Sequence, residues 1–194
     1  SMKYPSPWSF FPPPRSFTRG KSQGEEFQSQ ALSPINSDLD DHVRALTHEV
    51  GIIPFDLERV LAFGVEVFVL SEGCAFDSSL IAVVWQHSLR TGYLAALISL
   101  DQRAGQRIIW QSFVGGVLHD IGMLIFLIQQ PQIFTSAVNI AQSRSWDLQL
   151  VERQMLGSTH AEIGATFLAR WDVDEELVAT VGCHDDPMNS PYSA

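Results

Sequence analysis

The chain has 194 residues, 45% of them hydrophobic, and a formal net charge of −10 at pH 7. This length and this apolar content are sufficient for one globular domain with a sizeable core. Nucleic acids and anionic membrane surfaces both bind through clustered Lys and Arg, whereas the 12 basic residues here are scattered along the sequence. The composition therefore excludes a general nucleic-acid binder and predicts no membrane partner.

The first 35 residues differ in composition from the rest of the chain. They contain Phe11-Pro12-Pro13-Pro14 and then a stretch rich in Ser, Gln, Gly and Glu. Proline is unfavourable in helix interiors, so we predict a flexible or extended tail over residues 1–35 and one helical domain over residues 36–190. No apolar signal segment is visible, and the distant Cys74 and Cys183 favour buried free thiols. We therefore expect a cytoplasmic protein.

From residue 36 onward the sequence predicts an all-α fold, a compact multi-helix domain. Apolar residues recur at helical spacing, and no segment shows sustained alternation with period two. The first helix is expected to end at Gly51, the helix from His160 at Trp171, and the last near Cys183. Capping residues and prolines predict helix starts at these positions: Ser37, Pro54, Asp77-Ser78-Ser79, Pro131, Ser158 or Thr159, and Asp174. Further helical segments are expected over residues 105–130 and roughly 147–156.

The segment from Ile108 to Ile128 is apolar enough to be compared with a membrane span. It contains Gln111 and the adjacent pair His119 and Asp120, which are costly at bilayer depth. We therefore predict two buried core helices here, with a break or bend near residues 119–122.

The pair His119-Asp120 is the strongest chemical signal in the sequence. An imidazole and a carboxylate are costly to bury in an apolar run, but together they suit a divalent metal ion. His87, His160 and His184 lie beside or within other apolar helical patterns, and a helical bundle can bring such residues together. The alternatives stay open: each histidine can be a hydrogen-bonded core or helix-end residue, Asp120 can hold His119 without a metal, and Asp185-Asp186 can be a solvated turn.

Four ordered strings resemble a known family. Trp85-Gln86-His87-Ser88-Leu89 and Val117-Leu118-His119-Asp120-Ile121-Gly122 are similar to the HD superfamily of metal-dependent phosphohydrolases. The string from Leu156 to Trp171 and the segment from Val178 to Pro187 narrow the resemblance to HDOD domains, the HD-related output domains of bacterial signalling proteins. The resemblance covers about residues 45–188. It implies a helical domain and a divalent metal (Fe, Mn, Mg or Zn) held by His87, His119, Asp120 and Asp185, with His160 and His184 as further metal ligands or as phosphate contacts.

Departures from the related cyclic di-GMP phosphodiesterases with a GYP signature bear on catalysis. Met123 stands where those enzymes carry a lysine that meets the substrate phosphate, and His184-Asp185 stands where they carry paired histidines. Their metal set is completed by an aspartate on a following helix, which is not expected before Ala194. Arg90, one turn after His87, is the candidate cation for a phosphate group.

Three functions are compatible with these residues. The departures favour a regulatory module for bacterial signal transduction, with a partly retained metal site and weak or no catalysis, whose partner is a signalling protein or a small phosphorylated ligand. The second is a metal-dependent phosphohydrolase acting on a nucleotide or other phosphoester, with Asp120, His160 and Arg90 as catalytic residues. The third is a helical scaffold without metal.

Overall fold

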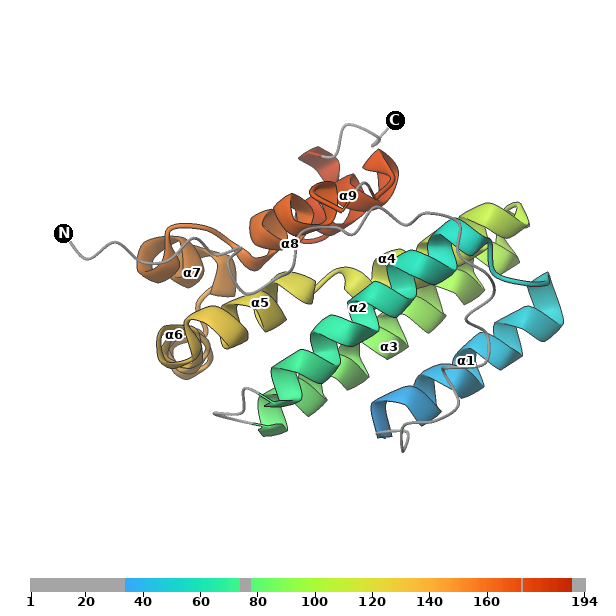
Figure 1. Cartoon of the computed structure of the whole chain (residues 1–194). Helices are drawn as coiled ribbons and strands as arrows, with labels where there is room; N and C mark the ends of the chain where they lie inside the picture. Colours follow the sequence, from blue (N-terminus) through green and yellow to red (C-terminus); the bar gives the residue numbers. More distant parts are fainter. Residues whose placement is uncertain (1–33, 74–77, 172, 190–194) are drawn as a thin grey trace.

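The computed structural model describes residues 34–73, 78–171 and 173–189, and the predicted tail lies outside these ranges except for its last two residues. All regular elements in these ranges are helical, which confirms the all-α prediction (Figure 1). They are α1 (Pro34–Val50), α2 (Phe55–Gly73), α3 (Ser78–Asp101), α4 (Gln106–Leu118), α5 (Ile121–Gln129), α6 (Pro131–Arg144), α7 (Leu148–Leu156), α8 (His160–Ala169), α9 (Glu175–Gly182) and a short 3₁₀ turn (Pro187–Asn189).

Several helix starts follow from local chemistry. Pro131 occupies the first turn of α6, where its missing N–H costs nothing. The Asp147 and Asp174 carboxylates accept hydrogen bonds from backbone N–H groups in the first turns of α7 and α9. Thr159 and Glu162 form a reciprocal capping box at the start of α8, so the cap is Thr159 and not Ser158. These starts were predicted from the sequence.

Two predicted boundaries were wrong. The first helix begins at Pro34, not at Ser37, because proline at the start of a helix loses no hydrogen bond and has a suitable φ angle. Helix α8 ends at Ala169, not at Trp171, because the N–H groups of Arg170 and Trp171 bond to carbonyls three residues back and tighten the last turn. The predicted cap at Asp77 lies outside the described residues.

Helix α3 packs closely along α4, and α2 covers α4 and α5 (Figure 1). Two glycines allow the α3–α4 approach: a Cβ on Gly116 would lie 2.5 Å from the Gly92 Cα, and a Cβ on Gly92 would lie 2.6 Å from the Phe113 carbonyl oxygen. On the other side, α5 packs on α8 and α8 packs on α9. The α4–α5 junction therefore lies between α3 and the α8–α9 pair.

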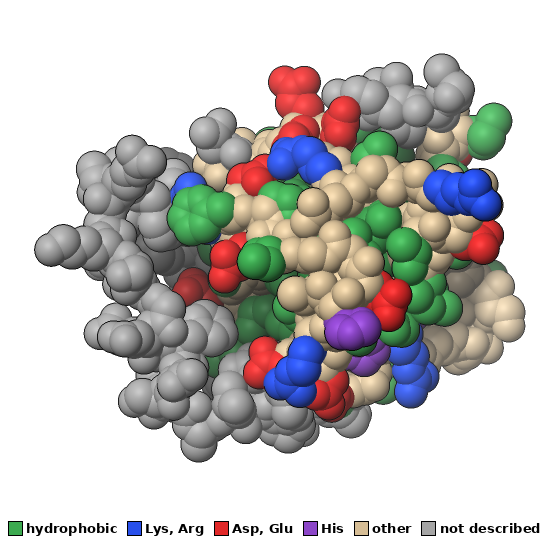
Figure 2. All heavy atoms as spheres, turned by 90° about the vertical axis from the view of Figure 1, so that its right-hand side faces the viewer, with side chains coloured by type: hydrophobic (Ala, Val, Ile, Leu, Met, Phe, Trp, Pro, Cys, Tyr) green, Lys and Arg blue, Asp and Glu red, His purple; other side chains and the backbone are tan. Residues whose placement is uncertain are grey.

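The expected break in the long apolar segment is confirmed, since α4 ends at Leu118 and α5 begins at Ile121. Within the described part of the chain, the stretch Gln106–Gln129 is long and apolar enough to cross a membrane by length and composition alone, and 78% of its most apolar window is buried inside the domain. This burial agrees with the predicted core helices. The face in Figure 2 mixes charged side chains of both signs with exposed apolar ones. Cys183 is a half-buried free thiol, and Cys74 lies outside the described residues.

Candidate metal centre

The junction between α4 and α5 carries the two residues at the centre of the site. His119 caps the end of α4 in a helical conformation, whereas Asp120 leaves the helix at φ −96° and ψ 13° before α5 begins. Both residues are buried. Their side chains meet, with 3.1 Å between the His119 Nε2 and the Asp120 Oδ2 atoms.

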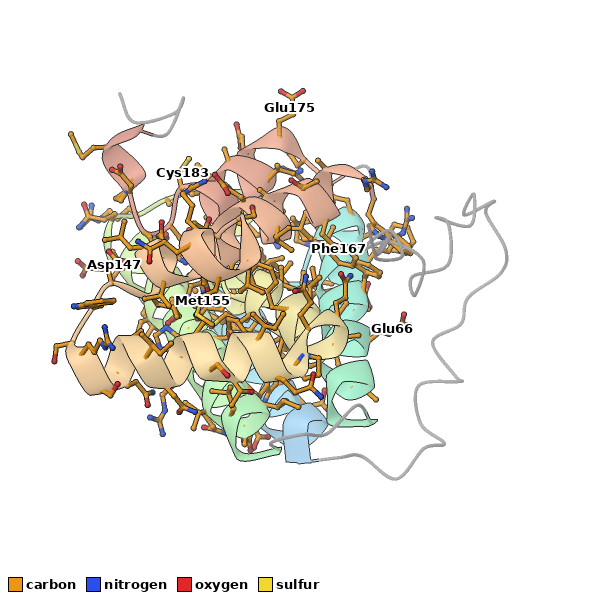
Figure 3. The ribbon with its side chains drawn as sticks, turned by 90° about the vertical axis from the view of Figure 1, so that its left-hand side faces the viewer. Glu66, Asp147, Met155, Phe167, Glu175 and Cys183 are labelled. Carbon is orange, nitrogen blue, oxygen red and sulfur yellow. The ribbon has the colours of Figure 1, made fainter. Side chains whose placement is uncertain are left out.

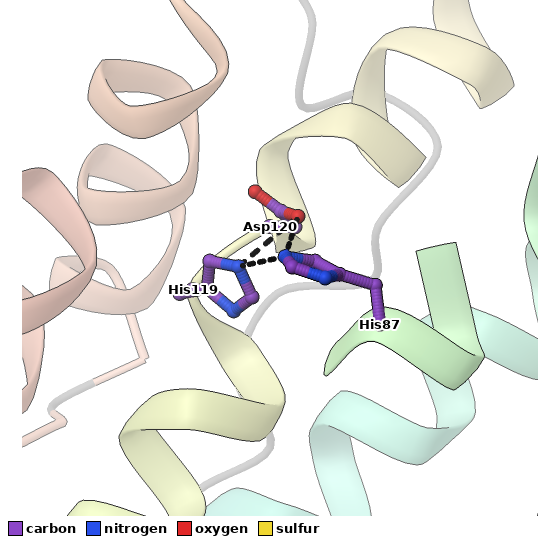
Figure 4. Close-up of side chains that lie close together, drawn as sticks. All are labelled: His87, His119 and Asp120. Atoms are coloured by element: carbon purple, nitrogen blue, oxygen red, sulfur yellow. Dashed lines mark hydrogen bonds and ion pairs between the residues drawn. The ribbon is translucent and has the colours of Figure 1, made fainter. Parts of the chain in front are cut away.

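A first group of donors consists of His87, His119 and one oxygen of Asp120. The Nε2 atom of His87, on α3, lies 3.2 Å from the Nε2 atom of His119 and 3.7 Å from the Asp120 Oδ2 atom (Figure 4). These ligand atoms are close enough together to hold one metal ion. We name this group the outer half, because the His87 side chain is 59% exposed.

A second group uses the other oxygen of Asp120. The Nε2 atoms of His160 and His184 each lie 3.5 Å from the Asp120 Oδ1 atom and 3.2 Å from each other. Both Nε2 atoms also lie 3.2 Å from the Asp185 Oδ2 atom, which accepts a hydrogen bond from the Gln149 side-chain amide. We name Asp120, His160, His184 and Asp185 the inner half.

Hydrogen bonds behind three of the imidazoles direct their Nε2 atoms into the site. The Nδ1 atoms of His119 and His184 lie 2.7 and 2.8 Å from the carbonyl oxygens of Gly116 and Val181. A carbonyl oxygen can only accept, so each Nδ1 donates, and in the neutral imidazole the lone pair is on Nε2. The Nδ1 atom of His160 donates in the same way to the buried carboxylate of Glu152.

This arrangement fits a divalent cation in each half. If the imidazoles are neutral, their Nε2 lone pairs face each other at 3.2 Å and face the Asp120 carboxylate, so these atoms repel one another. A cation or a proton between them removes this repulsion. Imidazole nitrogen with carboxylate oxygen is also a donor set that Zn, Fe and Mn accept. The metal site expected from the sequence is therefore chemically compatible with the residues that meet here.

The electrostatics of the metal-free site show how strongly these groups interact. Burial by itself would raise the pKa of Asp120, but hydrogen bonds from His119 and His184 and the charges of His119 and His160 hold it well below its usual range. Burial would lower the pKa of His184, but the hydrogen bonds to Asp120 and to the Val181 carbonyl and the charges of Asp185 and Asp120 raise it. Asp120 is thus ionised and available as a ligand.

Helix α8 reaches the site because of a close approach to α5. A Cβ on Gly122 would lie only 1.9 Å from the His160 carbonyl oxygen and 3.0 Å from the Gly164 backbone nitrogen. The capping box at Thr159 starts α8 immediately before His160. The glycine of the His-Asp-Ile-Gly string therefore allows His160 to lie next to Asp120.

Sequence reasoning missed one residue of this site, Glu152 on α7. Its side chain is fully buried, and its carboxylate accepts hydrogen bonds from the His160 backbone N–H and the His160 Nδ1–H at 2.9 and 2.8 Å. A signal was present in the sequence, because Glu152 falls in register with Leu148, Val151 and Met155 (Met155 is labelled in Figure 3). A carboxylate on an apolar helical stripe is costly to bury unless a hydrogen-bond donor or a positive charge lies next to it.

The six candidate ligands line a solvent-accessible cavity of about 610 Å³. Its other walls are Met123, Asp147, Leu148, Gln149 and Asp186. No Lys or Arg is among these lining residues of the described chain. Arg90 is exposed on α3 and does not line the cavity, so its role as a phosphate contact stays a prediction.

Three comparisons relate this chain to known proteins. It is 29% identical over 109 residues to an uncharacterized protein of Treponema pallidum (strain Nichols), a match covering 56% of this chain and 21% of that protein. An HDOD domain protein of unknown function from Geobacter sulfurreducens has a similar structure, with a TM-score of 0.59 and 19% identity over 86% of this chain and 63% of that one. A candidate phosphohydrolase from Shewanella amazonensis SB2B has a TM-score of 0.54 and 22% identity over 81% of this chain and 60% of that one.

At these identities the two solved structures show the fold alone. The chain spans about a fifth of the Treponema protein and less than two thirds of each solved chain. A family profile for the HDOD domain matches residues 38–187, a range that contains every candidate ligand. The chain therefore belongs to the HDOD family.

Proposed function

We propose that this domain is a metal-dependent phosphohydrolase that holds two divalent ions, one in each half of the site. The observation that supports this best is the position of Asp120, whose two carboxylate oxygens face two separate sets of imidazoles. A purely structural histidine needs one partner, whereas here four histidines from different segments converge on one carboxylate. Divalent ions bound in such a site lower the pKa of water and polarise a phosphoryl oxygen.

The chain's own residues contribute orientation and charge. Asp120 is kept ionised by the imidazoles around it, which makes it suitable as a shared ligand. Gln149 holds Asp185 through its side-chain amide, so this exposed carboxylate is positioned beside the Nε2 atoms of His160 and His184. Since the cavity is open to solvent, water and a small phosphoester both have access to this surface.

The cavity walls indicate which phosphoesters are suitable. Asp120, Asp147, Asp185 and Asp186 all line the cavity, and Met123 occupies the position of the lysine found in the related phosphodiesterases. The lining side chains that the structure describes therefore supply no permanent positive charge to a phosphate. We infer that substrate affinity depends on the bound ions, and that phosphoesters of low charge are preferred over nucleoside triphosphates.

The same acidic walls favour a second candidate function. A regulatory module that binds metal without turnover would need no cation for a substrate phosphate, and it would act through a signalling protein or a small phosphorylated ligand. This is the function that the departures from the GYP-type enzymes favoured. We propose the cytoplasm of a bacterial cell as the compartment in either case.

One experiment distinguishes the two candidate functions. Protein purified without chelator is analysed for Mn, Fe, Zn and Mg, reloaded with Mn²⁺, and assayed with bis-p-nitrophenyl phosphate and with cyclic and linear nucleotides. If the domain is a phosphohydrolase, we expect close to two ions per chain and measurable turnover. Asp120→Asn should abolish both the metal binding and the turnover. Asp40→Asn, at an exposed position of α1, is the matched control. Two bound ions without turnover would favour the regulatory module, and no bound metal would favour the scaffold.

A further inference from the structure

We propose that the two halves of the centre bind metal with different affinities, so that the inner half keeps its ion while the outer half exchanges. The proposal rests on the proposed metal centre, and it identifies the ion that exchanges when the metal concentration changes. It also assigns a role to Glu152, a positioning residue that touches no ion itself.

The number and burial of the donors favour the inner half. Each half has three ligand atoms close enough together to hold one ion, and in the inner half the partly exposed Asp185 adds a further oxygen, 3.2 Å from the His160 and His184 Nε2 atoms. The His160 side chain is 4% exposed, compared with 59% for His87. An exposed imidazole on a helix surface loses more side-chain freedom on binding an ion than one already fixed by its surroundings. The inner half therefore binds at the lower entropic cost.

The hydrogen bonds behind the ligands favour the same half. His160 donates its Nδ1–H to the fully buried Glu152 carboxylate, which also accepts the His160 backbone N–H. A carboxylate behind a metal-bound imidazole fixes the tautomer and makes the ligand nitrogen more basic, and losing such a partner commonly costs 10–100-fold in metal affinity. Among the described residues, the hydrogen bonds to the Glu152 carboxylate all come from His160. A cation on the far side of that ring would offset the buried negative charge.

The outer half has weaker support. His119 is backed by a carbonyl oxygen, which carries only a partial charge. Within the described part of the chain, no hydrogen bond is found for the Nδ1 atom of His87. His87 is thus free to turn away from Asp120 when no ion is present. The outer half would follow the free metal concentration, and the inner half would remain filled.

The test is a titration of the full chain, stripped with chelator, with Mn²⁺ followed by the electron paramagnetic resonance signal of the free ion. We expect two classes of ion, one per chain in each, separated by at least about tenfold in Kd. Glu152→Gln should weaken the tight class by roughly 10–100-fold and leave the weak class unchanged. His87→Ala should remove the weak class alone. Glu175→Gln, which changes an exposed carboxylate on α9 in the same way, serves as the matched control (Figure 3).

Three results would overturn the proposal: a single class of two equivalent ions, loss of the tight class in His87→Ala, or a Glu152→Gln variant that titrates like the wild type. If Glu152→Gln does not fold, His184→Asn tests the same half at a partly exposed position and should remove the tight class. A protein that binds no Mn²⁺, Zn²⁺ or Fe²⁺ would refute the metal centre itself. That outcome differs from two equivalent ions, which would leave the proposed function intact.

Discussion

Substitution of Gly122 by alanine should separate the two halves of the centre. The added Cβ would lie 1.9 Å from the His160 carbonyl oxygen and 2.7 Å from the His160 carbonyl carbon. These are backbone atoms, so no side chain can rotate away. To reach an ordinary contact of 3.4 Å, α5 and α8 must move apart by about 1.5 Å, the difference between 3.4 and 1.9 Å.

A shift of this size affects both stability and metal binding. Overpacking of a well-packed core costs roughly 1–3 kcal/mol, and in a domain of this size each kcal/mol lowers Tm by roughly 2–4 °C. We therefore expect a Tm about 2–12 °C below the wild type in the metal-free protein. Because the same shift moves His160 away from Asp120, the tightly bound ion should also be weakened by at least about tenfold.

The assay is differential scanning calorimetry of the stripped protein, followed by Mn²⁺ titration of the folded variant. Gly105→Ala is the control, since a Cβ at Gly105 meets no atom within 4 Å and φ is −66° there. It should change the free energy of unfolding by less than about 1 kcal/mol. If Gly122→Ala retains both the wild-type Tm and the wild-type tight binding, the α5–α8 contact does not position the site and the reasoning fails.

Three further predictions concern stability. Thr159→Ala removes the cap of α8 and should cost about 1 kcal/mol, measured by urea denaturation; an unchanged urea midpoint would contradict it. The pKa of His184 is raised in the folded, metal-free protein, so its contribution to stability is complete below pH 6.5 and is lost as pH rises through the folded value; His184→Asn should flatten this dependence. The hydrogen bond from Arg153 lowers the pKa of Glu162 to about 2, so the contribution of Glu162 to stability should decline as pH falls from 4.5 toward 2. Glu162→Gln should lack this part of the pH dependence.

Much of the fold could be predicted because its signals are local. Pro131, Asp147 and Asp174 act within one turn of their own helix, so their neighbours in the sequence are sufficient to identify the helix start. The break at His119-Asp120 was visible for the same reason, since two polar residues interrupt an apolar run. The start predicted at Ser37 was wrong because an equally local signal, Pro34, lies three residues earlier.

The site depended on contacts between residues distant in the sequence. The family resemblance identified the six candidate ligands. It did not divide them into two halves, because that division depends on which oxygen of Asp120 each imidazole faces. Glu152 lies eight residues before His160 and becomes its partner only because α7 and α8 meet after a tight turn. Arg90 follows His87 by one turn, yet it does not line the cavity.

The sequence by itself thus determined which segments are helical and which side chains have metal-binding chemistry, because capping and side-chain type act over one or two turns. The tertiary structure decided which atoms share an ion, which imidazole has a carboxylate behind it and which remains exposed. These properties depend on the packing of α3 against α4 and of α5 against α8, where Gly92, Gly116 and Gly122 allow backbones to touch. Such packing depends on many distant residues at once and has no single local signal.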